Sequence, residues 1–190
     1  MFSREDIRSY IVRAYNCACM HGFHDKEPSI SKYLMLVLTE VAEAVDADRR
    51  SRRAVLDGRP SFVDDAFDDW FTTHVKDTVE DELADVCIRL FDLCGAFVCE
   101  PDDGLYDADA REQFDYLVGG LSFPERCYHL CSLMYANHDK CMEELVPRVS
   151  ASMLHFVFMM CEDMRIDIRL HIDLKMAYNL RRPVLNGKEY

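Results

Sequence analysis

Residues 33–48, YLMLVLTEVAEAVDAD, carry the pattern that decides the fold class. Apolar residues recur there at intervals of four, three and four, which predicts one buried stripe of an α-helix: Leu34, Leu38, Val41 and Val45. Beside this stripe Glu40 and Glu43 are three residues apart, so their Cβ atoms would lie about 5–6 Å from each other on one side of the helix. Two carboxylates in so apolar a setting are costly unless a cation or a hydrogen-bond network compensates them.

The composition favours one all-α domain spanning residues 1–190. The chain has only seven glycines and six prolines, and its 49% hydrophobic content is enough for a real core. A net charge of −13 argues against nucleic acid and anionic membranes as partners, but it permits a phosphorylated ligand whose charge is neutralised by metal ions. No signal peptide and no membrane-spanning run is recognisable, and none of the nine cysteines forms a C-x-x-C pair. We therefore expect a cytoplasmic protein with reduced thiols.

Local signals predict where several helices begin and end. Three capping patterns are expected to start helices: Ser3 with Asp6, Thr78 with Asp81, and Ser122 with Glu125. The first helix should run from residue 4 to about 20, where Gly22 ends it, and Pro147 should interrupt a later one. From Ser150 a helical pattern continues to Pro183, followed by a C-terminal tail at 183–190. Residues 51–76 are the least regular stretch, and we expect short helical pieces and solvated charges there.

A second acidic pair repeats the spacing of the first. Glu82 and Asp85 lie on the flank of a helix predicted over residues 79–97, and if the two helices pack side by side, four carboxylates converge. Such a group repels itself unless a cation fills the space, and oxygen ligands without histidine suit Mg²⁺ or Mn²⁺. Composition alone would give about six acidic pairs at this spacing, so only the apolar setting distinguishes these two. The alternative is that the acids pair with neighbours such as Arg89.

Several segments in a fixed order carry a family resemblance. TEVAEAVDADRR (39–50) and VEDELADVCIRLFDLCG (79–95) follow the lead-in HGFHDKEPSISKYLMLVLTE (21–40) and precede LKMAYNLRRPVLNGKEY (174–190). Together they resemble the MazG-like branch of the all-α nucleoside triphosphate pyrophosphohydrolases, whose pattern is E-x-x-E on one helix and E-x-x-D on the next. The resemblance implies a four-helix-type bundle that assembles as a homodimer or homotetramer. It also implies Mg²⁺-dependent cleavage of a nucleoside triphosphate into the monophosphate and pyrophosphate.

The resemblance also implies roles for single residues. The metal ligands would be the four motif acids, Glu40, Glu43, Glu82 and Asp85, with Glu40 or Glu43 accepting the proton of the attacking water. The substrate would meet a polar stripe on the last helix and a lysine of the tail: Lys175, Asn179, Arg182 and Lys188. His24 lies in a loop with Phe23 and Asp25 that precedes the first motif, where it can read a base edge.

Two departures from the family pattern keep other functions open. Thirty-eight residues separate Glu43 from Glu82, so residues 51–76 look like an insertion, which holds the single tryptophan, Trp70. Thr39 stands where the family often has a further glutamate. These departures motivate the alternative of a catalytically silent regulator that binds a nucleotide or metal. A third reading is a helical interaction protein whose acids only form ion pairs.

Overall fold

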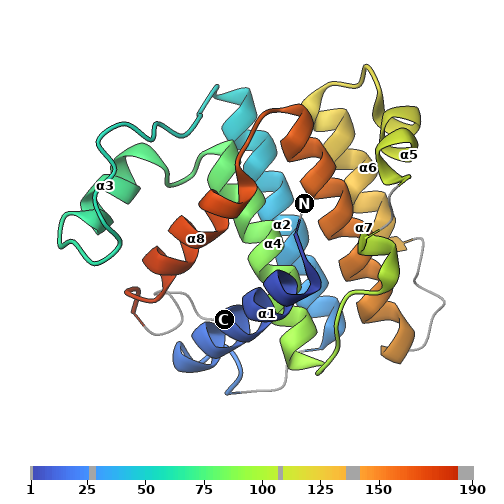
Figure 1. The fold of residues 1–190 in the computed structure, drawn as a ribbon, viewed down its shortest axis with the longest axis horizontal. Helices are drawn as coiled ribbons and strands as arrows, with labels where there is room; N and C mark the ends of the chain where they lie inside the picture. Colours follow the sequence, from blue (N-terminus) through green and yellow to red (C-terminus); the bar gives the residue numbers. More distant parts are fainter. Residues whose placement is uncertain (1, 26–28, 107–108, 136–141, 184–190) are drawn as a thin grey trace.

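The computed structural model describes residues 2–25, 29–106, 109–135 and 142–183, and within these ranges the protein is all-helical (Figure 1). Its elements, in chain order, are α1 (Arg4–Met20), α2 (Ile30–Arg49), α3 (Phe67–His74), α4 (Val79–Ala96), the 3₁₀ helix η1 (Asp103–Tyr106), α5 (Ala110–Val118), α6 (Phe123–Tyr135), α7 (Met142–Asp163) and α8 (Ile168–Asn179). None of the described helices is both long and apolar enough to cross a membrane.

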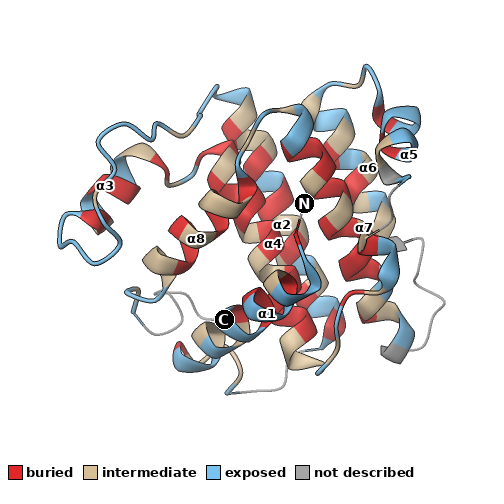
Figure 2. Cartoon of the chain, viewed as in Figure 1, coloured by how far each residue is buried: buried red, intermediate tan, exposed pale blue. Residues whose placement is uncertain are grey.

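Helix α4 is the centre of the fold. It packs on α2, α1, α8 and α7, so four helices surround it (Figure 1). Twelve of its 18 residues are buried, because apolar side chains occupy nearly every direction around its axis. Figure 2 shows the buried residues of α2 and α4 running along the middle of the molecule. A helix enclosed to this degree holds its few polar side chains in fixed positions.

Helix α1 begins and ends where the local signals predict. Ser3 and Asp6 form a reciprocal capping box, and the helix ends before Gly22, whose φ of 78° is readily adopted only by glycine. Its packing against α4 is close at one point: a Cβ atom built on Gly95 would lie 2.5 Å from the Cβ of Tyr15. The absence of a side chain at residue 95 therefore allows α1 and α4 to approach each other.

The buried face of α2 differs from the predicted stripe. Only Val41 of the four predicted positions is fully buried, whereas Leu34, Leu38 and Val45 are half-buried against the core. The fully buried positions are Ile30, Tyr33, Val37, Glu40, Val41, Ala44 and Ala47. This difference arises because α2 packs on α6 as well as on α4, so its apolar sector is wider than one stripe. The correction matters because Glu40 belongs to the buried set and Glu43 does not.

Two expectations for the C-terminal half are wrong. Pro147 does not interrupt a helix but lies inside α7, and its carbonyl accepts a hydrogen bond from the Asp102 N–H. The pattern from Ser150 to Pro183 is not one helix, because the chain turns between α7 and α8. Arg165 has a φ of 60° there, and the Asp167 side chain accepts from the Leu170 N–H to start α8.

Residues 51–76 contain one short helix, α3, which packs against α8 (Figure 1). A second small core forms where α3 and the residue after it meet the middle of α8: Phe67, Trp70, Phe71, Val75 and Leu174. Trp70 is buried, and its indole N–H donates to the Asp57 carbonyl. This segment therefore packs against α8, the helix that carries most of the predicted substrate contacts.

Candidate functional site

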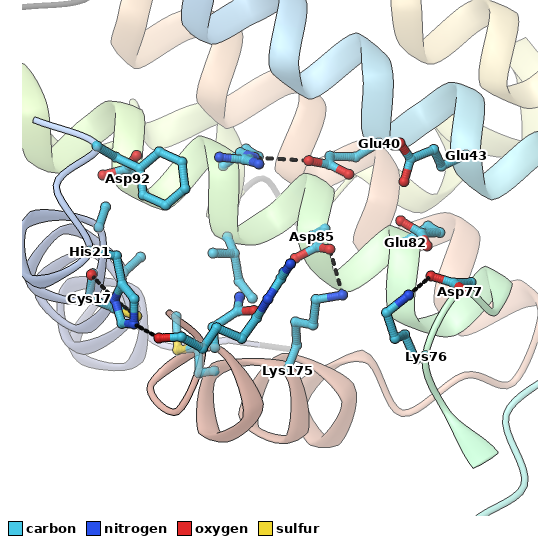
Figure 3. Close-up of a pocket in the computed structure, with 18 residues that line it drawn as sticks. Cys17, His21, Glu40, Glu43, Lys76, Asp77, Glu82, Asp85, Asp92 and Lys175 are labelled. Carbon is cyan, nitrogen blue, oxygen red and sulfur yellow. Dashed lines mark hydrogen bonds and ion pairs between the residues drawn. The ribbon is translucent and has the colours of Figure 1, made fainter. Parts of the chain in front are cut away.

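A cavity of about 210 Å³ lies where α1, α2, α4 and α8 meet. All four motif acids line it: Glu40 and Glu43 from α2, and Glu82 and Asp85 from α4 (Figure 3). The strong packing of α2 against α4 is what brings these two acidic pairs to the same place. Two pairs of residues with 38 residues between them in the sequence thus form one wall of the cavity.

Three of the four acids form a tight group. Glu40, Glu82 and Asp85 each offer a carboxylate oxygen within 4.8 Å of the others, and Glu40 and Glu82 are buried. Glu43 is exposed and lies at the rim, where it also lines a smaller adjoining cavity of about 190 Å³. The structure therefore brings together one glutamate of α2 with both acids of α4, and leaves Glu43 beside them.

Burial changes the acidity of this group. Loss of hydration raises the pKa of Glu82 to about 9, and the nearby Asp85 carboxylate adds to the effect. Burial, with a contribution from Asp85, raises the pKa of Glu40 to about 7, against the opposing influence of Arg89. Both carboxyl groups consequently hold protons more strongly than they would in water. A cation that lies among them would favour their ionised forms.

Two basic side chains compensate part of the negative charge. Arg89 donates from Nε to Oε1 of Glu40 over 2.9 Å, and thus joins α4 to α2. Lys175, from α8, lies 2.7 Å from Oδ2 of Asp85 (Figure 3). The same nitrogen lies 2.8 Å from Oδ2 of Asp81. Burial alone would lower the pKa of Lys175, but the two aspartates outweigh it and raise that pKa above its usual range. Arg89, the neighbour that the sequence suggests as a partner for the acids, does pair with one of them, Glu40 on α2, and Lys175 on α8 pairs with Asp85.

The donor set fits a hard divalent cation. It consists of carboxylate oxygens from two packed helices, with no histidine or thiol in the group. In the part of the chain that the structure describes, this is the one group of three or more acidic, histidine or cysteine ligands close enough to share an ion. Glu40, Glu82 and Asp85 are therefore the residues that could hold Mg²⁺ or Mn²⁺, and Glu43 lines the same cavity outside this group.

The predicted substrate residues of α8 lie around the same cavity. Lys175, Asn179 and Arg182 all line it, although Arg182 follows the end of the helix. The side-chain oxygen of Asn179 is buried and lacks a hydrogen-bond partner among the described residues, so it is available to a ligand. The backbone carbonyl of Arg182 accepts a hydrogen bond from Nε2 of His21, which fixes this end of the chain to α1.

His24 lies in the predicted loop before α2 but is not among the residues that line the cavity. Its Nε2 lies 2.8 Å from Oδ1 of Asp92 and its Nδ1 lies 2.9 Å from the hydroxyl of Tyr33, so both ring nitrogens have partners. Its neighbour Phe23 lines the cavity, with the Arg89 guanidinium 5.8 Å from the ring centroid. Phe23 therefore borders the cavity, whereas His24 is bonded to Asp92 and Tyr33. Lys188 lies outside the described residues.

Sequence reasoning missed Asp81 and the turn before α4. Asp81 enters the prediction only as a capping partner of Thr78, a role that its backbone N–H does fulfil. Its carboxylate, however, pairs with Lys175, 94 residues away, which no local pattern can reveal. Lys76 and Asp77, also in the wall of the cavity, were read as part of a solvated surface.

Comparison of the chain with protein-family models, with curated protein sequences and with solved structures gave no match. The residues described above form a cavity in which an acidic group from α2 and α4 faces basic and amide side chains from α8.

Proposed function

We propose that this protein is a Mg²⁺-dependent nucleoside triphosphate pyrophosphohydrolase of the MazG-like, all-α kind. One observation carries the proposal: carboxylate oxygens of Glu40, Glu82 and Asp85 come within 4.8 Å of one another in the wall of a cavity. That cavity is also lined by the lysine, asparagine and arginine that would face a polyphosphate. Acids that attract a metal and bases that attract phosphate are thus present in the same space.

The acidic wall supplies the metal-binding side of the reaction. Glu40, Glu82 and Asp85 would hold Mg²⁺, which when bound neutralises phosphate charge and lowers the pKa of a water ligand. Glu43 is exposed at the rim, so its carboxylate is free to rotate and accept a proton from water at the cavity mouth. Arg89 keeps Glu40 oriented toward the group through its hydrogen bond.

The remaining walls would orient the nucleotide. Lys175 and Arg182 carry the positive charge for phosphate oxygens, and the unpartnered side-chain oxygen of Asn179 can accept from a sugar hydroxyl or from a base. Phe23 presents an aromatic ring on the α1 side, where a base can stack. A triphosphate placed in this way would have its phosphates near the acids and its base near the loop.

The proposal is tested by product analysis. Purified protein is incubated with Mg²⁺ and a panel of standard and modified NTPs and dNTPs, and monophosphate and pyrophosphate are measured together. We expect both products from at least one nucleotide, and their loss in Glu82→Gln and Glu43→Gln. Glu112→Gln, which changes an exposed acid on α5, serves as the matched control. Failure of every nucleotide to release pyrophosphate would contradict the proposal.

A second candidate is a nucleotide- or metal-binding regulator that does not turn over its ligand. The observation that favours it is that Arg89 and Lys175 already pair with two of the acids. In addition, the Thr39 hydroxyl donates to the Met35 carbonyl, one turn back in its own helix, and so faces the backbone. This candidate predicts tight binding of a nucleotide, seen by calorimetry, without release of pyrophosphate.

A further inference from the structure

Asp81 is a fully buried acid whose burial the metal site does not explain. Its exposed fraction is 0%, and it lies outside the group formed by Glu40, Glu82 and Asp85. Oδ2 accepts hydrogen bonds from the Asp77 N–H at 3.0 Å and from Lys175 at 2.8 Å. Oδ1 is buried and has no partner among the described residues. Burying a carboxylate with one oxygen unsatisfied is costly, so this arrangement needs a reason.

The Lys175 ammonium lies between two different kinds of acid. On one side is Oδ2 of Asp81, at 2.8 Å, and on the other is Oδ2 of Asp85, at 2.7 Å, which belongs to the metal-binding group. An ammonium has three N–H donors, so these two contacts leave one donor for a ligand in the cavity. A cation that recruited Asp85 would compete with Lys175 for its carboxylate, whereas the contact with Asp81 would persist.

We propose that Asp81 is a positioning residue that holds Lys175 beside the metal-binding acids so that its ammonium donates to a phosphate group of the ligand. The proposal rests on the proposed function for the chemistry of the ligand. Without Asp81, a lysine that lost Asp85 to a cation would have no fixed partner, and its four-carbon chain could leave the cavity. With Asp81, the ammonium remains within reach of a metal-bound phosphate.

The Asp81 carboxylate is itself held in place by the backbone. Asp81 accepts from the N–H of Asp77, a residue in the left-handed region with a φ of 57° in the turn before α4. The same turn lines the cavity, and the Thr78 hydroxyl accepts from the Asp81 N–H to cap α4. Asp81 is therefore fixed at both its backbone and its side chain, as a positioning residue must be.

A purely structural ion pair between α4 and α8 would give a different result. Removing one partner of such a pair lowers the stability of the fold, but the molecules that remain folded would bind ligand as before. A positioning role affects the affinity for phosphate in folded protein, and it does so only through Lys175. Binding measurements on folded variants separate the two.

The test is a double-mutant cycle read by calorimetric titration with inorganic pyrophosphate in saturating Mg²⁺. We expect Asp81→Asn and Lys175→Met each to weaken pyrophosphate binding by about tenfold, the usual effect of one charge-assisted hydrogen bond. The double variant should be no weaker than Lys175→Met, because Asp81 acts only through the lysine. Unchanged affinity in Asp81→Asn, or losses that add in the double variant, would overturn the proposal.

Two further measurements keep the result interpretable. Binding of Mn²⁺ alone should not be weakened in Lys175→Met, because Asp85 loses a competitor; a loss of Mn²⁺ affinity there contradicts our assignment. Arg169→Met is the matched control, since it removes an ion pair between α8 and Asp6 of α1, away from the cavity, and should leave pyrophosphate binding unchanged. If Asp81→Asn does not fold, pyrophosphate affinity is compared between Lys175→Met and the double variant alone. Weaker binding by the double variant would overturn the positioning role of Asp81.

This experiment separates our inference from the enzymatic proposal. Pyrophosphate binding requires no turnover, so a protein that hydrolyses no nucleotide can still show the expected cycle. Conversely, a protein that releases pyrophosphate from nucleotides but binds it equally well with Asp81→Asn keeps its function and loses the positioning role.

Discussion

Arg89 on α4 donates from Nε to Oε1 of Glu40 on α2 over 2.9 Å, and both side chains are largely enclosed. The pair joins the two helices that carry the acidic motifs. The alternative that the motif acids pair with neighbours such as Arg89 therefore holds for Glu40.

Replacing Arg89 by methionine should destabilise the protein in a pH-dependent way. A buried ion pair that loses one partner costs about 3–5 kcal/mol while the remaining charge persists. Glu40 already has a pKa raised to about 7, so it can escape this cost by protonation in acid but not in base. Urea unfolding in EDTA should therefore show a larger loss near pH 8.5 than near pH 5.5. In the double variant with Arg89→Met and Glu40→Gln, the loss of stability should be the same near pH 8.5 as near pH 5.5.

Glu82→Gln should abolish stabilisation by metal with little cost to the protein in EDTA. Because burial raises the pKa of Glu82 to about 9, its carboxyl group is mostly protonated near neutral pH, and glutamine matches that form in size and polarity. Thermal denaturation with and without Mn²⁺ measures both effects, since a bound ligand stabilises by RT ln(1 + [L]/Kd). A variant that keeps the full Mn²⁺-dependent rise in Tm would show that Glu82 is not a ligand.

Stability in EDTA should fall as the pH rises from about 5 to about 9. Glu40 and Glu82 have ordinary pKa values of 4.5, raised in the fold to about 7 and about 9. Between these limits the folded chain binds more protons than the unfolded chain, so its free energy of unfolding decreases with pH. Asp6 contributes in the opposite sense, because Arg169 lowers its pKa, but only below its ordinary value of 3.8. Denaturant unfolding at three pH values checks the slope, and Glu82→Gln should make it shallower.

Gly95→Ala should destabilise the fold even though alanine is the better helix former. The new Cβ would lie 2.5 Å from the Cβ of Tyr15, an atom that cannot rotate away, so α1 and α4 would have to separate. Overpacking of this kind costs about 1–3 kcal/mol, which outweighs a gain in helix propensity of about 1 kcal/mol. The free energy of unfolding from urea titration decides the sign. A more stable variant would contradict the close approach of the two helices.

Trp70 should report on the packing of α3 against α8 and not on the ligand. Its ring is buried in the second core, and its indole N–H is bonded to the Asp57 carbonyl, so we expect blue-shifted emission that Mg²⁺ with nucleotide does not quench. Trp70→Ala should cost about 3–5 kcal/mol in stability while leaving the affinity for Mn²⁺ unchanged. Quenching by nucleotide would indicate stacking on the base.

The sequence predicts those features that are determined by residues close together in the chain. The caps at Ser3 and Thr78 were found because side chain and backbone lie within three residues of each other. The turn between α7 and α8 was missed, since residues 164–167 contain no glycine or proline and only Asp167 gives a weak capping signal. The spacing of the acids reveals the two pairs. It cannot reveal that Glu43 lies at the rim, because that depends on which face α2 presents to α4 and α6.

The central position of α4 determines which parts of the molecule tolerate substitution. One side of this helix builds the core and another displays Glu82 and Asp85, so almost any substitution along it disturbs packing or chemistry at once. Phe23, Lys76 and Asp77 border the same cavity without belonging to the main core. Substitutions at these borders can therefore change which molecules the cavity admits while the helical core stays the same.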